Sequence, residues 1–141
     1  MFGAMIGDIA GSRFEFSNIK TKDFELLSKD CFFTDDTVMT VAVAKALTVL
    51  GAKAVQDPQK HADQLKKEFI KQMCDYGARY PYAGYGGMFA RWLHTDDPKP
   101  YNSFGNGSAM RVSPCALAAP SLESALELAG LSASVSHKQE R

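Results

Sequence analysis

Apolar side chains recur at helical spacing over much of this sequence, most clearly between residues 62 and 76. There they follow one another at steps of three and four, which places them on one face of an α-helix. Asp57-Pro58 precedes the pattern and predicts an N-cap with proline in the first turn, and Gly77 predicts the end of the helix. The apolar positions are Ala62, Leu65, Phe69, Met73 and Tyr76.

Two further helices are expected before this one. The first covers residues 2–11, where a glycine at every fourth position favours a close crossing with another helix. The second runs from about residue 35 to residue 50, and Gly51 is its predicted stop. The apolar side expected for this second helix consists of Val38, Val41, Ala42, Leu47 and Leu50.

The C-terminal half also reads as helices joined by loops. A short helix is expected around residues 88–93, and a glycine-rich loop then leads into another that ends near Ala118. A last helix should begin at Pro120-Ser121, with its apolar side formed by Leu122, Ala125, Leu126, Ala129 and Leu131. No segment alternates between apolar and polar residues with period two, so the predicted fold class is all-α.

Composition narrows the class of protein. The chain has 141 residues, 45% of them hydrophobic and 23% charged, which is ordinary for a single soluble domain. Sixteen basic and sixteen acidic residues cancel, and no basic stripe alternates with aromatic residues. A nucleic-acid partner is therefore not expected.

Cysteine spacing and the N-terminal segment bear on the compartment. Cys31, Cys74 and Cys115 lack C-x-x-C spacing, so we expect reduced thiols. The N-terminal segment is mildly apolar but has no basic region and contains Asp8, so neither a secretion signal nor a membrane span is expected there. These features predict a cytoplasmic protein that does not contact a membrane.

The strongest candidate for chemistry is Thr34-Asp35-Asp36-Thr37, directly ahead of an expected helix. Its carboxylates and hydroxyls are hard oxygen ligands, which suit Mg²⁺, Mn²⁺ or Ca²⁺ better than zinc. Two aspartates balance one divalent cation, and Asp8 and Glu15 are the obvious further carboxylates. The competing interpretation is an ordinary helix N-terminus, with Thr34 as N-cap and the aspartates in the first turn.

A glycine-rich loop between residues 104 and 109 is the second candidate. Glycines allow a backbone to approach a ligand closely, and a following helix presents N–H groups to a phosphate. A tight turn with Asn106 and Gly107 at positive φ, followed by Ser108 as an N-cap, explains the same residues equally well.

Three other features carry weaker signals. Glu15 lies between Phe14 and Phe16, an environment suited to a carboxylate that transfers protons, although an ion pair with Arg13 is the commoner arrangement. His137 is a lone histidine, which is more often structural or exposed than catalytic. A second Thr-Asp-Asp run at residues 95–97 precedes Pro98 and is expected to be a solvated loop.

Taken together, the motifs resemble the ADP-ribosylglycohydrolase family, which includes the dinitrogenase-reductase-activating glycohydrolases. Five segments are similar to family motifs and occur in the expected order. They are Gly7-Asp8-Ile9-Ala10-Gly11 with the acid Glu15, Phe33-Thr34-Asp35-Asp36-Thr37, the aromatic–glycine loop 82–87, the loop 105–111 and the segment 132–137 that ends in Ser136-His137.

This resemblance implies an orthogonal helical bundle that removes ADP-ribose from a modified protein side chain or small acceptor by cleaving the bond at the distal ribose. It implies a binuclear Mg²⁺ or Mn²⁺ centre with Thr34, Asp35 and Asp36 as ligands. Glu15, Asp35 and Asp36 are the implied catalytic residues. The implied substrate-binding residues, which hold the diphosphate and the nucleotide, are Gly105, Asn106, Gly107, Ser108, Ala109 and His137.

One departure from the family limits this expectation. The family's metal centre is completed by a D-x-D-T motif in a second half, and nothing after His137 supplies it. We therefore expect residues 1–141 to form a single partial domain, the N-terminal portion of such an enzyme, whose partner is a complementing C-terminal half or a second copy in a homodimer. The alternatives are a non-catalytic ADP-ribose-binding module and an unrelated helical protein whose motifs are caps and packing glycines.

Overall fold

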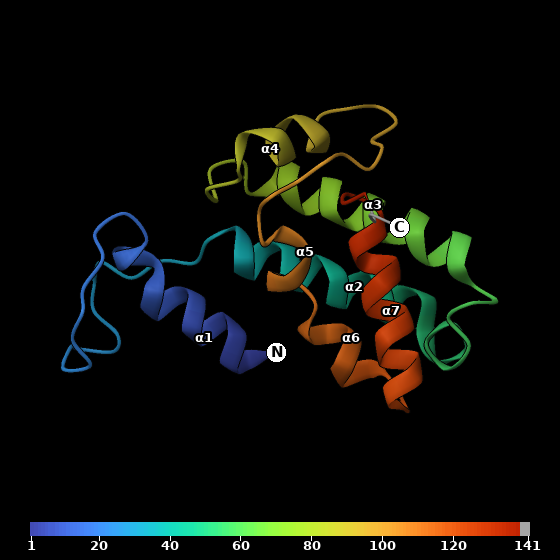
Figure 1. Cartoon of the computed structure of the whole chain (residues 1–141), viewed down its shortest axis with the longest axis horizontal. Coiled ribbons are helices and arrows are strands. Elements are labelled where there is room, and N and C mark those ends of the chain that lie inside the picture. The colour runs from blue at the N-terminus through green and yellow to red at the C-terminus, as the bar shows by residue number, and fades with distance from the viewer. Residues whose placement is uncertain (139–141) are drawn as a thin grey trace.

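The structure is a computed structural model that describes residues 1–138. These residues form helices joined by loops, with no β-strand among them, which confirms the predicted all-α class (Figure 1). The elements in chain order are α1 (Phe2–Gly11), the 3-10 turn η1 (Ser12–Phe14), α2 (Asp35–Gln56), α3 (Ala62–Arg79), α4 (Gly87–Leu93), α5 (Gly107–Met110), α6 (Ser113–Ala118) and α7 (Leu122–Ser134).

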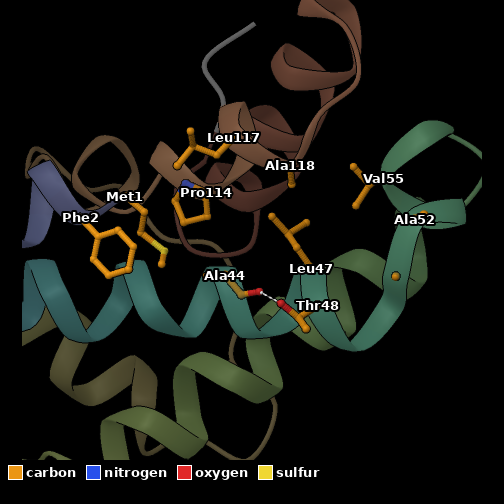
Figure 2. Close-up of a pocket in the computed structure, with 11 residues that line it drawn as sticks. Met1, Phe2, Ala44, Leu47, Thr48, Ala52, Val55, Pro114, Leu117 and Ala118 are labelled. Carbon is orange, nitrogen blue, oxygen red and sulfur yellow. Dashed lines mark hydrogen bonds between the residues drawn. The ribbon is translucent and has the colours of Figure 1, made fainter.

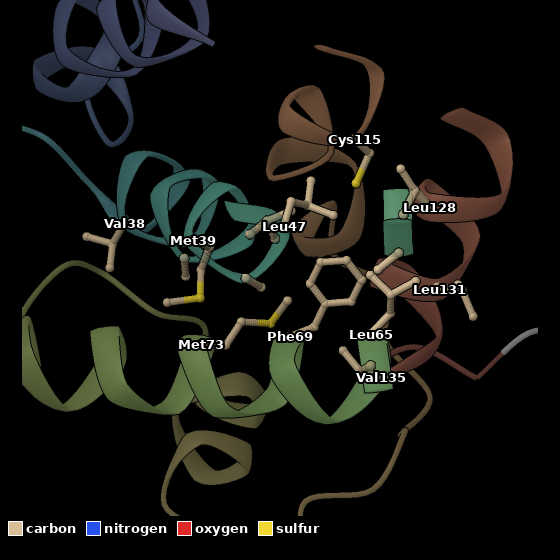
Figure 3. Close-up of a cluster of buried hydrophobic side chains, with 14 of the residues drawn as sticks. Val38, Met39, Leu47, Leu65, Phe69, Met73, Cys115, Leu128, Leu131 and Val135 are labelled. Carbon is tan, nitrogen blue, oxygen red and sulfur yellow. The ribbon is translucent and has the colours of Figure 1, made fainter. Parts of the chain in front are cut away.

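The core forms where α2 packs on α3, and α6 and α7 cover this pair. Figure 3 shows the side chain of Phe69 pointing from α3 into the middle of the cluster, toward residues of α2 and α7. Leu65, Phe69 and Met73 are completely buried, so the apolar face predicted for residues 62–76 is confirmed at its three central positions. From α7, Leu128 is completely buried in the same cluster.

Helix α2 is the longest element, with 22 residues. By length and composition alone it is long and apolar enough to cross a membrane. Its apolar residues are used in the core, however, since Met39, Ala42, Val43 and Ala46 are fully buried. Gly51 breaks the helix as predicted, with φ +74°, and a short helical segment resumes and ends at Gln56.

The start and end predicted for α3 were wrong. Asp57 accepts a hydrogen bond from the backbone N–H of Lys60, and this turn delays the helix until Ala62. Gly77 lies inside the helix rather than at its end, and its lack of a side chain lets Leu93 of α4 pack directly on it. A Cβ added at residue 77 would lie 2.9 Å from Leu93 Cδ1.

One predicted packing face was also wrong, and a second was wrong in part, since Leu131 of α7 is buried as predicted. Gly3, Gly7 and Gly11 are exposed, and nothing lies within 4 Å of a Cβ built on any of them, so they make no close helix crossing. In α7, Leu122 is 76% exposed and Leu126 is 65% exposed. The buried face of that helix is instead formed by Ser124, Leu128, Leu131 and Ser132.

Replacing one leucine of each kind tests this assignment of buried faces. Leu65→Ala should lower the free energy of unfolding by about 2–5 kcal/mol, because it leaves a cavity in the core. The matched change Leu122→Ala should stay within about 0.5 kcal/mol of the parent, because its side chain is already in solvent. Chemical denaturation measures both, and similar losses for the two variants would contradict the assignment.

Candidate functional site

The aspartates of the Thr34–Thr37 motif lie in the first turn of α2. Thr34 has an extended backbone, and its hydroxyl accepts a hydrogen bond from the N–H of Asp36, so it is the N-cap of this helix. The N–H of Asp35 donates to the carbonyl of Ala83 at 2.7 Å, which ties the aromatic–glycine loop to the same helix end. The cap predicted from sequence is therefore present, and it places both carboxylates at the rim of a cleft.

Asp8, on α1, forms the densest set of hydrogen bonds at this point. Its Oδ2 accepts from the N–H of Thr34 at 2.8 Å, from the N–H of Thr37 at 3.2 Å and from the Thr37 hydroxyl at 2.6 Å. Its Oδ1 accepts from the Thr34 hydroxyl at 2.5 Å. A carboxylate from another helix thus supplements the N-cap of α2, where unpaired N–H groups favour an anion.

Two adjoining cavities form the cleft. The first, of about 670 Å³, is lined by Asp8, Glu15, Asp35 and Asp36 together with backbone and side chains of the loops around residues 84–86 and 106. The second, of about 350 Å³, continues toward α4 and the C-terminal end of α7. The two cavities share Asp35, Gly86, Asn106 and Met110, so the acidic end and the glycine-rich loop belong to one site.

The crowding of carboxylates changes their protonation. Burial, together with the negative charges of Asp36 and Glu15, raises the pKa of Asp35 from its ordinary value of 3.8 to about 7. Burial also raises the pKa of Asp36, with Asp8 and Glu15 adding to the effect. Burial and the charge of Asp35 raise the pKa of Tyr85 to about 12, so this phenol stays protonated.

Glu15 directly follows α1 and η1, which place it at the cleft. It lines the first cavity and is exposed to solvent. The ion pair with Arg13 considered from sequence is not formed, because the Arg13 guanidinium donates to Ser28 Oγ at 2.8 Å and to the carbonyl of Glu25. Arg13 therefore holds the loop that follows η1, and within residues 1–138 the carboxylate of Glu15 forms no salt bridge.

The glycine-rich loop is held from beneath by Arg111, which is completely buried. Arg111 Nη2 donates to the carbonyl of Ser132 at 2.7 Å and to Ser136 Oγ at 2.8 Å. Neither Asn106 nor Gly107 has positive φ, so the tight turn considered from sequence is not formed; Asn106 instead precedes α5 as its N-cap. The loop 105–110 is thereby fixed to the C-terminal end of α7.

His137 lines the second cavity and is positioned by its neighbours. Its Nδ1 lies 2.8 Å from Ser136 Oγ, and its backbone pairs with Tyr101 in an isolated parallel bridge. Because Ser136 already accepts a hydrogen bond from Arg111, its proton is available to Nδ1, which leaves the ring proton on Nε2. Burial and the charge of Arg111 lower the pKa of His137, which favours this neutral ring.

All candidate site residues named from sequence line one of the two cavities, except Ser108 and Ala109, which line neither. Three contributors were not identified as such from sequence. Tyr101 and Ser136 support the second cavity, and Asp8 caps α2 rather than simply adding charge. Residues 95–97 line neither cavity, and Asp96 and Asp97 are exposed, as predicted.

A separate groove of about 640 Å³ lies between the start of α1, α2 and α6 (Figure 2). Its lining is almost entirely apolar and includes Phe2, Leu47 and Leu117. The hydroxyl of Thr48 donates to the carbonyl of Ala44 within α2, so it is not free to orient a ligand. The groove offers no acidic or basic side chain for chemistry.

An all-α scaffold with an acidic cleft beside a glycine-rich loop is suited to a hydrolase that acts on a polar substrate. A sequence model of the family described as ADP-ribosylglycohydrolase matches residues 1–141, the whole chain. The chain therefore belongs to the ADP-ribosylglycohydrolase family. The activity of this family is that of a glycohydrolase.

The raised pKa of Asp35 predicts a pH-dependent loss of stability in chelator-treated protein. The folded chain holds the proton of Asp35 at higher pH than the unfolded chain does. The contribution of this proton to stability is therefore fully present below about pH 4 and is lost as pH rises through about 7. Asp35→Asn removes this loss and should raise stability at pH 8 by roughly 1 kcal/mol, a value reduced for solvent screening.

Thermal unfolding of both proteins at pH 5 and pH 8 makes the comparison. The gain from Asp35→Asn should be larger at pH 8 than at pH 5. Asp96→Asn, the same change in the exposed run, is the matched control and should show no such difference. A gain that is equal at both pH values would contradict the assigned titration of Asp35.

Proposed function

We propose that this protein binds an ADP-ribosylated side chain or small acceptor in the acidic cleft and hydrolyses the bond at the distal ribose, with a divalent cation held by Thr34, Asp35 and Asp36. The observation that carries the proposal is the continuous cleft in which these residues and the glycine-rich loop share a boundary. Family membership supports the type of substrate.

The donor set at the start of α2 supports a cation. All the donors are oxygen atoms, and no lysine or arginine is among the residues that line the first cavity, so its four carboxylates have no basic partner there. Residues 1–138 contain no group of three or more His, Cys, Asp or Glu side chains able to hold a metal by themselves. A cation that keeps several waters around one or two carboxylates, as Mg²⁺ does, suits such a set; Mn²⁺ shares its oxygen ligands.

When bound, the cation would orient ribose hydroxyls and lower the pKa of a bound water. The chain's own residues have two tasks at the bond that is cleaved. Glu15 accepts the proton of the attacking water, whose oxygen forms a bond to the anomeric carbon as the bond to the acceptor breaks. The electron pair of the broken bond leaves with the acceptor, which takes up a proton from solvent. Asp35 and Asp36 keep negative charge beside the ribose, where an oxocarbenium-like state develops positive charge.

The second cavity is the proposed place for the diphosphate and nucleotide. Residues 105–107 line this cavity, and Phe104, which is fully exposed, offers an aromatic face there. His137 Nε2 has no hydrogen-bond partner among the described residues and lines the same cavity. Its N–H is a donor suited to a polar atom of the nucleotide.

Release of free ADP-ribose from ADP-ribosylated arginine, ADP-ribosylated serine and an ADP-ribose ester, each with Mg²⁺ or Mn²⁺, tests the activity. Glu15→Gln should lower kcat at least about 100-fold with little change in KM, because it removes the proton acceptor and keeps the shape. Glu123→Gln, an equivalent change in the first turn of α7, should leave kcat unchanged. A kcat for Glu15→Gln equal to that of the wild-type protein would contradict the role given to Glu15.

The alternative, a non-catalytic ADP-ribose-binding module, gives a different result. Calorimetry with ADP-ribose would then show binding that does not depend on a divalent cation, and none of the three substrates would be turned over. Cation-dependent binding accompanied by turnover supports the hydrolase.

A further inference from the structure

We propose that Asp8 is a positioning residue for the cation: it fixes the Thr34 hydroxyl with its proton toward α1 and a lone pair toward the cleft. This inference rests on the proposed cation at the start of α2. It assigns Asp8 a task that differs from that of a metal ligand, although Asp8 lines the same cavity as Asp35 and Asp36.

The hydrogen bonds of Asp8 direct both of its carboxylate oxygens toward Thr34 and Thr37. An ionised carboxylate offers about four lone-pair sites. Asp8 accepts four hydrogen bonds, three on Oδ2 and one on Oδ1, all from Thr34 and Thr37. With three donors around it, Oδ2 has no lone pair left for a cation, and Oδ1 keeps one beside the hydrogen bond from Thr34. Asp35 and Asp36 are the freer ligands, because their side-chain oxygens accept no hydrogen bond from another residue within residues 1–138.

The same geometry fixes the proton of Thr34. Its Oγ1 lies 2.5 Å from Asp8 Oδ1, and because an ionised carboxylate only accepts, the hydroxyl proton must lie between these two atoms. One lone pair of Oγ1 accepts from the N–H of Asp36 at 3.4 Å. The other is directed away from both partners, and Thr34 itself lines the first cavity. A neutral hydroxyl binds a cation through such a lone pair.

A second contact, made by Ser12, helps to fix the position of Thr34 relative to Asp8. The hydroxyl of Ser12, which is buried, accepts from the N–H of Phe32 at 3.1 Å and donates to the carbonyl of Ile9 at 2.9 Å. The segment that leads into Thr34 is therefore attached to the end of α1 through Ser12 as well as through Asp8. This fixation supports a role in orientation, because the hydroxyl has little freedom to turn.

Asp8→Asn reverses the polarity of one hydrogen bond with almost no change in shape. The two N–H groups on the Oδ2 side require the amide oxygen there, which turns the amide NH₂ toward Thr34 Oγ1. The NH₂ then donates to Oγ1, and the hydroxyl proton must point elsewhere. Mn²⁺ affinity of chelator-treated protein, measured by calorimetry, should fall about 10- to 100-fold, which is typical when the partner that orients a metal ligand is lost.

A double-mutant cycle with Thr34→Val separates orientation from loss of charge. Valine has no hydroxyl to orient, so in that background Asp8→Asn should lower Mn²⁺ affinity no more than about threefold, the residual effect of one lost negative charge. Thr37→Val is the matched control, since it also removes a hydroxyl that donates to Asp8 but does not line the cavity. It should lower the Tm of the metal-free protein and leave Mn²⁺ affinity within about threefold.

Each outcome decides the inference. Equal losses from Asp8→Asn in both backgrounds would show Asp8 to be a ligand itself, and unchanged affinity in Asp8→Asn alone would show that it has no role at the cation; either overturns the inference while the proposed function stands. If the wild-type protein takes up no Mn²⁺, the proposed function fails and this inference with it. Should Asp8→Asn not fold, as judged by circular dichroism, Asp8→Glu keeps the charge and moves the acceptor, and the same cycle applies.

Discussion

The geometry of the cleft depends on one junction, in which the Asp8 carboxylate of α1 binds the N-terminus of α2. Helix α1 packs on α2 and leads through η1 to Glu15, whereas the core is built from α2, α3, α4, α6 and α7. Figure 1 shows α1 and the loop after it at one end of the molecule, beside the start of α2 and apart from α3. The position of Glu15 relative to Asp35 is therefore set largely by hydrogen bonds between Asp8 and the threonines of α2.

This junction also concentrates negative charge at a cost in stability. Asp8 is matched by N–H and O–H donors, but Asp35 and Asp36 are partly buried beside it without a basic partner lining the cavity. An unpaired carboxylate that is partly removed from water disfavours its charged form, which is why the pKa of Asp35 is raised to about 7. Destabilisation of this kind, retained at one point of an otherwise well-packed fold, is typical of functional sites.

The all-α class was predictable because no segment of the sequence alternates with period two. The core face of α3 was predictable because Leu65, Phe69 and Met73 repeat at helical spacing and therefore lie on one side of a helix. The sequence could not predict which apolar faces find a partner. The glycines of α1 and the leucines 122 and 126 of α7 show similar patterns, yet they face solvent. Periodicity describes a face, whereas burial depends on a neighbouring element whose position is a property of the whole fold.

The candidate site shows the same division. Thr34 as N-cap and the two aspartates in the first turn were predictable, because capping is local to a few residues. The role of Asp8 was not, since it acts on residues 26 and 29 positions later in the chain. Arg111 is a similar case: its burial beneath the glycine-rich loop, and its bonds to Ser132 and Ser136, depend on how α7 packs.

The two sides of the cleft are held in different ways, and this difference has a mechanical consequence. The loop 105–110 is attached to α7 through Arg111 and to α2 through the hydroxyl of Thr40, which donates to the carbonyl of Met110. Both attachments reach the core, so this side keeps its geometry as long as the core is folded. The side that carries Glu15 is attached to the start of α2 through Asp8 and Ser12, at the edge of the fold. A disturbance at this junction would therefore displace Glu15 from Asp35 while the glycine-rich loop and His137 stay in place.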